Sequence, residues 1–213
     1  MNNKVNKLRI VLKTLKRIIP KPQTELYYEN GFQLLIAVVL SAQCTDERVN
    51  KITKDLFKKF PDPYSMYKAS EKEIYEIIKS CSYPNSKTKY LKHIAKELVE
   101  KFNGKVPDKY EDLIKMKGIG RKSANVVLSI LYKKPVIAVD THIKRVSIRL
   151  GFVQTNSSSL QVEKFLTKNV PQNLRAIAHH YLLLFGRYYC KSKKPLCNSC
   201  PFIKICDYYK NLK

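Results

Sequence analysis

Four cysteines near the end of the chain have the spacing of a metal site. Cys190, Cys197, Cys200 and Cys206 follow the pattern C-x6-C-x2-C-x5-C, with lysines and prolines in the intervening segments. Four thiolates coordinate zinc or an iron–sulfur cluster. Zinc sites favour two close C-x2-C pairs, and only Cys197 and Cys200 form one here. The spacing predicts a metal bound by four cysteines and leaves zinc and iron–sulfur both open.

A lysine that follows a glycine turn is the candidate nucleophile. In the segment 111–135, two apolar stretches flank Gly118 and Gly120, and Arg121 and Lys122 follow at once. Two glycines between helices allow a tight turn with positive φ, and the N–H groups that open the second helix suit a DNA phosphate. A plain helix–helix connection is the alternative. Cations in a first helical turn oppose the helix dipole, which favours a role other than helix stability.

The chemistry available to Lys122 depends on its surroundings. Burial beside other cations and a helix N-terminus disfavours the charged form of a lysine, and a neutral amine attacks a sugar carbon to give a Schiff base. We expect Lys122 to be buried in this way; a surface phosphate contact is the alternative. Asp140, eighteen residues on, precedes a predicted helix and is suited to be its N-cap. That position would also keep the carboxylate ionised and fixed, whereas His142 is expected to be structural.

The charge of the chain favours nucleic acid as its partner. Lys and Arg number 41 against 17 Asp and Glu, which gives a formal net charge of +24. A bias towards lysine explains part of this excess but not the scarcity of acidic residues. A surface this positive attracts polyphosphates.

The N-terminal sequence and the longest apolar run indicate a soluble, cytosolic protein. Residues 1–10 lack the apolar core and cleavage site of a signal peptide. The run 32–40 is too short to span a bilayer. In the cytosol, clustered cysteines bind metal more often than they form disulfides.

The hydrophobic periodicity predicts an all-α fold. Residues 32–43 are apolar all round, as in a helix at the centre of a bundle, although a strand remains possible there. Pro20 and Pro22 end the first predicted helix, and Asn103 with Gly104 ends another. Apolar stripes with helical spacing are Val5, Leu8, Leu12, Leu15 and Ile19; Val49, Ile52, Leu56 and Phe60; Leu91, Ile94, Leu98 and Phe102; and Leu174, Ile177, Tyr181 and Leu184.

With these motifs in order, the sequence resembles the endonuclease III family, the helix-hairpin-helix, iron–sulfur DNA glycosylases with abasic-site lyase activity. The resemblance covers nearly the whole chain. The matching segments are LLIAVVLSAQCTD (34–46), NSK (85–87), NGKVP (103–107), GIGRKSANVVL (118–128), AVDTHIKRV (138–146), HHYLLLFGRYYC (179–190) and the terminal cysteines.

The resemblance implies a two-lobed architecture. A six-helix barrel over 24–134 would contain the helix-hairpin-helix at about 108–128. Residues 1–23 would join 135–213 in a cluster domain, with the cluster loop at 190–206. The active site would lie in the cleft between the two lobes.

The resemblance also implies roles for single residues. Lys122 would be the nucleophile, and Asp140 the carboxylate that assists proton movement and stabilises positive charge on the sugar. Gln43 matches the family residue that enters the gap left by the flipped base.

For the cysteines, the resemblance favours one [4Fe–4S] cluster over zinc. The cluster would shape a basic loop whose lysines touch the DNA backbone, and it would not be the chemical centre. These loop lysines are Lys191, Lys193 and Lys194.

Two positions depart from the family pattern. Lys117 stands where a proline usually precedes the glycine turn, which adds a cation beside Gly118 and Gly120 where a phosphate is expected. Tyr83, followed by Pro84, stands where many members have a leucine, and we expect its ring to wedge into the duplex by stacking.

The sequence therefore predicts a monomeric, cytoplasmic and nucleoid-associated base-excision enzyme that acts on double-stranded DNA with damaged bases or abasic sites. It would remove oxidised pyrimidines and cleave the abasic site by β-elimination, without a nucleotide cofactor. One alternative is a glycosylase of the same superfamily that lacks lyase activity; such relatives generally lack the lysine at position 122. The other is a non-catalytic DNA-binding module, which would have lost Lys122 or Asp140. No motif reports the preferred lesion.

Overall fold

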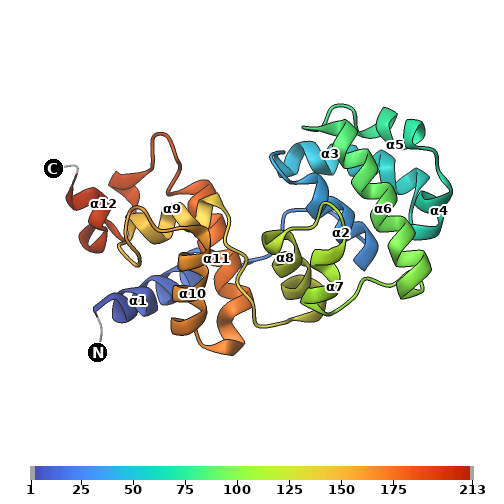
Figure 1. Ribbon diagram of the computed structural model, residues 1–213. Coiled ribbons are helices and arrows are strands. Elements are labelled where there is room, and N and C mark those ends of the chain that lie inside the picture. The colour runs from blue at the N-terminus through green and yellow to red at the C-terminus, as the bar shows by residue number, and fades with distance from the viewer. Residues whose placement is uncertain (1–2, 212–213) are drawn as a thin grey trace. The chain divides into compact units, whose positions relative to one another are not determined.

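The computed structural model describes residues 3–211, and every regular element in that range is helical (Figure 1). The all-α prediction is confirmed. The described chain forms two compact units. The middle unit is Glu25–Tyr132, and the terminal unit consists of the described residues before Glu25 together with those from Lys133 on.

The middle unit holds seven helices in chain order. They are α2 (Gly31–Leu40), α3 (Asp46–Lys59), α4 (Pro63–Lys68), α5 (Glu71–Ile78), α6 (Pro84–Phe102), α7 (Tyr110–Lys115) and α8 (Arg121–Tyr132).

The terminal unit is built from both ends of the described chain. Its elements are α1 (Asn3–Ile18), α9 (Thr141–Arg149), α10 (Ser159–Asn169), η1 (Gln172–Leu174), α11 (Arg175–Tyr188), η2 (Cys197–Ser199), η3 (Ile203–Ile205) and α12 (Asp207–Lys210).

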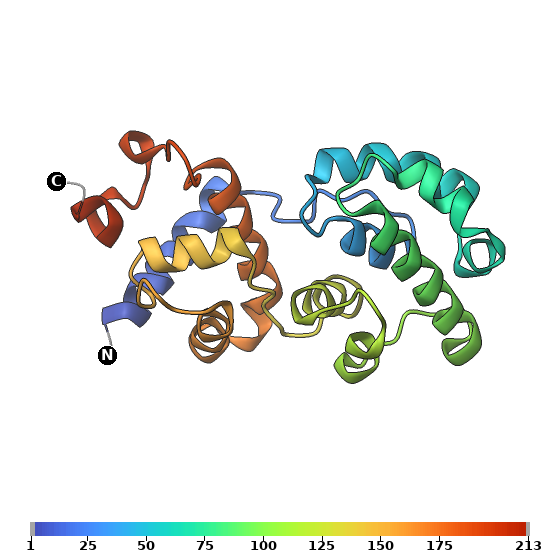
Figure 2. The same ribbon diagram turned by 45° about the horizontal axis from the view of Figure 1, so that its top comes forward.

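Helix α2 is the centre of the middle unit. Its residues from Phe32 to Leu40 are all buried, as an apolar sequence without a polar face requires. It packs against α3, α6 and α8, while α4 and α5 lie along α6 (Figures 1 and 2). The run 32–40 is therefore a helix, and the alternative of a strand is excluded. The prediction that this buried helix continues to residue 43 is wrong, because α2 ends at Leu40 and the exposed Ala42 and Gln43 lie in the turn that follows.

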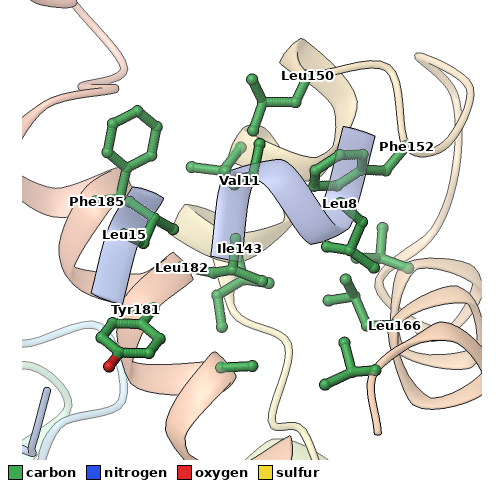
Figure 3. Close-up of a cluster of buried hydrophobic side chains, with 14 of the residues drawn as sticks. Leu8, Val11, Leu15, Ile143, Leu150, Phe152, Leu166, Tyr181, Leu182 and Phe185 are labelled. Carbon is green, nitrogen blue, oxygen red and sulfur yellow. The ribbon is translucent and has the colours of Figure 1, made fainter. Parts of the chain in front are cut away.

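Helix α1 packs into the core of the terminal unit. Leu8, Val11 and Leu15 are fully buried in one cluster with residues of α9 and α11, among them Ile143 and Phe185 (Figure 3). The predicted stripe was partly wrong, because Leu12 and Val5 are only half-buried and Val11 takes the central position.

The predicted stripe of α11 was also partly wrong. Leu174 and Ile177 are exposed, because α11 begins only at Arg175 and its first turn lies at the edge of the unit. The face that packs inwards comes later in the helix. It consists of Ala178, His179, Tyr181, Leu182, Leu184, Phe185 and Gly186.

Candidate active site and DNA-binding residues

The turn between α7 and α8 needs a glycine at only one of its two glycine positions. Gly118 has φ of +89°, and a Cβ built there would lie 2.6 Å from Cγ of Tyr90, so a side chain is excluded on both counts. Gly120 has no positive φ, and a Cβ there would meet nothing within 4 Å. The expectation of positive φ holds for Gly118 alone. Gly120 leaves open space at the start of α8.

Helix α8 begins immediately after this open turn. The N–H of Ala124 donates to the carbonyl of Gly120 at 2.9 Å, which is the first bond of the helix. The N–H groups of Lys122 and Ser123, in the first turn, therefore have no acceptor within the helix. Such N–H groups, together with the positive end of the helix dipole, attract anions.

The two cations of this first turn have different surroundings. The guanidinium of Arg121 lies 5.7 Å from the ring centre of Tyr110 and donates to its hydroxyl at 3.4 Å, which gives Arg121 a structural role. Lys122 is exposed, and its side chain has no hydrogen-bond or ion-pair partner in the described part of the chain. The expected burial of Lys122 is wrong. Its amine is accessible from solvent instead, as is that of Lys117.

Asp140 is the N-cap of α9, as the sequence predicted. Its Oδ1 accepts the N–H of Ile143 at 2.8 Å, and its carbonyl accepts the N–H of Lys144 at 2.9 Å. Residues 137–139, which precede Asp140, are buried. Asp140 itself is half-buried and lies at the end of this buried segment. Lys122 belongs to the middle unit and Asp140 to the terminal unit.

The structure brings Gln43 and Tyr83 onto neighbouring turns, which the sequence did not show. Both side chains are exposed, Tyr83 to 65%. The hydroxyl of Ser82 donates to the carbonyl of Gln43 at 2.7 Å and so links the two turns. Lys87 lies buried beneath them, and sequence reasoning missed it because the motif NSK gives no sign that its lysine is buried.

The four terminal cysteines gather at one end of the terminal unit. Cys206 is buried, and the other three are half-buried. Burial raises the pKa of the Cys200 thiol to about 11, the backbone N–H of Phe202 lowers it, and the three other thiols raise it further. Burial also raises the pKa of Cys206, with contributions from Cys190 and Cys197. The four sulfurs thus lie close enough to influence one another.

Four thiols are the donor set of zinc and iron–sulfur sites, although the side chains are not arranged around a metal position in the described residues. Metal-bound cysteines must be thiolates, and buried thiols with raised pKa values reach that state when a cation binds them. Backbone N–H groups of Phe202, Tyr208 and Tyr209 are directed at the Cys200 and Cys206 sulfurs, as occurs around cluster ligands. Within residues 3–211, no group of three or more His, Cys, Asp or Glu side chains is arranged to hold a metal ion.

Two arginines on α9 hold the loop between the first two of these cysteines. Arg145 donates to the carbonyls of Gly186 and Cys190 at 2.7 and 2.9 Å. Arg149 donates to the carbonyls of Lys191 and Ser192 at 2.6 and 3.1 Å. Sequence reasoning missed both arginines, although their spacing of four residues placed them on one helix face.

The lysines of this loop point into solvent. Lys191, Lys193 and Lys194 are all exposed, as the sequence predicted for a basic loop. The loop closes where the N–H of Leu196 donates to the carbonyl of Tyr189 at 3.0 Å. The arginines bind backbone carbonyls of the loop, and its lysine side chains lie in solvent.

None of the helices in residues 3–211 combines the length and the apolar character needed to cross a bilayer.

Comparison with known proteins identifies the family. The model of the HhH-GPD superfamily of base excision DNA repair proteins matches residues 36–172. Endonuclease III of Bacillus subtilis is 40% identical over 202 residues, which cover 95% of this chain and 92% of that protein. Endonuclease III of Escherichia coli is 41% identical over 206 residues, which cover 97% of each.

Solved structures agree with the sequence relatives. A trapped endonuclease III–DNA covalent intermediate superposes with a TM-score of 0.95 at 42% identity, covering 100% of this chain and 99% of that one. A thermostable thymine-DNA glycosylase shares the fold, with a TM-score of 0.85 at 22% identity and coverage of 97% and 98%. The chain belongs to the endonuclease III family, within the HhH-GPD superfamily of base excision DNA repair proteins.

Proposed function

We propose that this protein removes oxidised pyrimidines from duplex DNA and cleaves the resulting abasic site through an imine formed on Lys122. As a member of the endonuclease III family, the chain is a base-excision DNA glycosylase with abasic-site lyase activity, and its partner is double-stranded DNA. The observation that supports the assignment to Lys122 is its exposed, unpartnered amine at the start of α8, beside the open space at Gly120.

In the proposed reaction, the neutral amine of Lys122 attacks C1′ of the damaged nucleotide. The bond from C1′ to the base breaks, and the base leaves with a proton. The nitrogen then loses a proton and the sugar ring opens: the C1′–O4′ bond breaks, O4′ takes up a proton, and an imine forms between C1′ and the lysine. This imine makes the C2′ protons acidic, so loss of one of them breaks the C3′–O bond, releases the 3′ phosphate and nicks the strand. Hydrolysis then regenerates the lysine. Asp140 contributes a carboxylate that stabilises positive charge on the sugar and assists proton movement.

The proposed function is tested by reduction with borohydride in the presence of DNA that contains an abasic site. An imine is reduced to a stable amine, so the wild-type protein should remain covalently attached to the DNA. Failure of the wild-type protein to form this adduct, under conditions where it binds the DNA, would refute the lyase mechanism.

We also propose which groups bind the duplex. The N–H groups at the start of α8, the turn Gly118–Gly120 and the exposed Lys117 bind one phosphate segment, and the loop lysines bind another. Gln43 and Tyr83 fill the space that the extruded nucleotide leaves. The middle unit corresponds to the six-helix barrel of the family and the terminal unit to its cluster domain, in a monomer that works in the cytoplasm on the nucleoid.

Removal of the loop charges should flatten the salt dependence of DNA binding. Replacing Lys191, Lys193 and Lys194 by glutamine should reduce the slope of log K against log salt by about 0.9 for each phosphate that the variant no longer binds. Affinity for all DNA sequences should fall alike, because phosphates carry no sequence information. Fluorescence anisotropy over a salt series measures both quantities.

The control for this experiment removes the same charge elsewhere. Lys68, Lys72 and Lys79 are exposed lysines on and after α4 and α5, next to several glutamates. Their triple replacement by glutamine should leave the slope near the wild-type value. Equal flattening in both triple variants would show that net charge alone matters, and would contradict the assignment of the loop.

We propose that Cys190, Cys197, Cys200 and Cys206 hold one [4Fe–4S] cluster. When bound, the cluster ties four points of the segment together and supplies no step of base removal. The chain itself supports this role, because Arg145 and Arg149 fix the carbonyls on the loop side of Cys190 while Phe202, fully buried against Phe185, fixes the other side.

Protein purified without oxygen should be yellow-brown and contain iron and sulfide. Cys200→Ser should lose most of the iron, because a serine hydroxyl replaces a thiolate ligand. Cys44→Ser is the matched control, since Cys44 lies in the middle unit, and it should keep the full iron content. Stoichiometric zinc without iron in the wild-type protein would overturn the assignment.

A further inference from the structure

Two exposed residues of the middle unit have a left-handed backbone conformation, which glycine adopts far more easily than other residues. Gln43 has φ of +54° and Tyr83 has φ of +56°. Left-handed backbone is unfavourable for residues with a Cβ. Tyr83 also precedes Pro84, a position that is restricted further. Such conformations persist where the surrounding structure imposes them, and they are concentrated at functional sites.

A buried ammonium, that of Lys87, lies against both of these turns. This side chain is only 4% exposed. Its Nζ donates to the carbonyls of Leu40 and Ala42 at 2.8 and 2.7 Å and to Sγ of Cys81 at 3.2 Å. An ammonium has three donors, and all three are used.

These three bonds reach both turns at once. Leu40 is the last residue of α2, and Ala42 immediately precedes Gln43. Cys81 lies two residues before Tyr83, on the second turn. Lys87 therefore binds the backbone just ahead of Gln43 and the Cys81 side chain two residues ahead of Tyr83.

The described surroundings of Lys87 contain no carboxylate among its hydrogen-bond partners. Its ammonium lies at the C-terminal end of α2, where the helix dipole favours a cation. Its three partners are nevertheless two carbonyls and a thiol whose pKa burial raises, so no anion among them offsets the buried charge. A buried charge without a paired anion is costly to remove from water, so apolar packing alone does not explain a lysine at this position. What an apolar side chain would not supply is three directed donors.

We propose that Lys87 is a positioning residue for nucleotide extrusion: it holds the turns of Gln43 and Tyr83 in the shape that enters the duplex. Ser82, whose hydroxyl binds the Gln43 carbonyl, completes the link. The inference rests on the proposed roles of Gln43 and Tyr83 in the function described above. Neither Lys87 nor Ser82 touches the reacting sugar in this proposal.

The variant that tests it is Lys87→Met, which keeps the length of the side chain and removes its donors. A matched control lies on the same helix. Lys92 of α6 donates to the carbonyls of Tyr67 and Ala69 at 2.5 and 2.6 Å, and so caps the end of α4 much as Lys87 caps α2. Lys92→Met removes the same kind of hydrogen bond, but its partners, the carbonyls of Tyr67 and Ala69, belong to neither turn.

Borohydride trapping is measured under single-turnover conditions on two substrates. In the first, the abasic site lies in an intact duplex opposite adenine, so the sugar must be extruded before it reacts. In the second, the site lies opposite a gap in the other strand, so little extrusion is needed. A 2-aminopurine opposite the duplex site reports separately on insertion through its fluorescence.

For Lys87→Met, we expect trapping in the duplex to slow by about tenfold to a hundredfold, the effect of a misplaced functional group. Trapping opposite the gap should fall far less, and the rise in 2-aminopurine fluorescence should shrink. Lys92→Met should behave like the wild type on both substrates. Three results would each overturn the proposal. Lys87→Met could slow trapping equally on both substrates, it could behave like Lys92→Met, or it could trap at the wild-type rate.

If Lys87→Met does not fold, Ser82→Ala decides the question. It removes a single half-buried hydroxyl, so its melting temperature should be unchanged while trapping in the duplex slows relative to the gapped substrate. Wild-type rates for Ser82→Ala on both substrates would then contradict the proposal. Failure of the proposed function is distinguishable, because in that case the wild-type protein forms no adduct on either substrate.

Discussion

Lys122→Gln is expected to abolish the covalent adduct with abasic DNA while leaving DNA binding nearly unchanged. Glutamine has no amine to form an imine, so the loss should exceed about a thousandfold, as for removal of a catalytic nucleophile. Only one charge is removed from a chain of net charge +24, so the dissociation constant should change little. Borohydride trapping and fluorescence anisotropy on the same oligonucleotide measure the two effects.

Lys117→Gln is the matched control for this prediction. It removes an exposed cation five residues earlier, from the same turn, and takes away no nucleophile in the proposed mechanism. Its affinity should weaken, and its trapping at saturating protein should persist. If Lys122→Gln still forms the adduct at the wild-type rate, another amine carries the chemistry and the assignment of Lys122 is wrong.

Asp140→Asn should lower turnover by about a hundredfold to a thousandfold, within the range that positioned acid–base and electrostatic groups contribute. The asparagine oxygen still accepts the N–H of Ile143, so the cap of α9 and the melting temperature should be kept. DNA binding should also be kept, and slow trapping is compatible with the proposed role. The measurement is single-turnover strand cleavage beside a thermal melt.

Comparison of Asp140→Asn with Asp140→Ala separates the effect of the carboxylate charge on turnover from the effect of the N-cap on stability. Alanine removes both, so its turnover should be as low as that of the asparagine variant and its stability lower by about 1 kcal/mol. If Asp140→Asn turns over like the wild type and only Asp140→Ala is impaired, the residue is a cap and nothing more.

Local sequence patterns predicted most of the helices of this fold. Helix α2 follows from an unbroken apolar run, and α3 follows from Thr45, whose hydroxyl accepts the N–H of Arg48 at 3.3 Å. Asp140 was identified as an N-cap for the same reason. Such features depend on residues three or four positions apart, so the sequence displays them directly.

Contacts between distant segments could not be predicted in this way. Arg149 binds carbonyls more than forty residues further along the chain, and Lys87 binds the end of α2 from α6. Neither has a nearby residue that signals its partner. The burial of Lys122 was inferred from its charged neighbours, but one of these, Arg121, is accommodated by Tyr110. Exposure depends on tertiary packing, which neighbours in sequence do not reveal.

The discontinuity of the terminal unit affects how the protein is made. Helix α1 leaves the ribosome before the middle unit, yet the residues that cover Leu8, Val11 and Leu15 belong to α9 and α11, and the cluster includes Phe202. The middle unit is complete once Tyr132 has emerged and is free to fold during synthesis, as domains generally do. The apolar face of α1 therefore stays exposed until α9, α11 and the segment around Phe202 have been translated. Nascent chains therefore pass through a stage in which a folded middle unit follows an amphipathic helix whose partner helices have not yet been made, and exposed apolar surface of this kind is prone to aggregation.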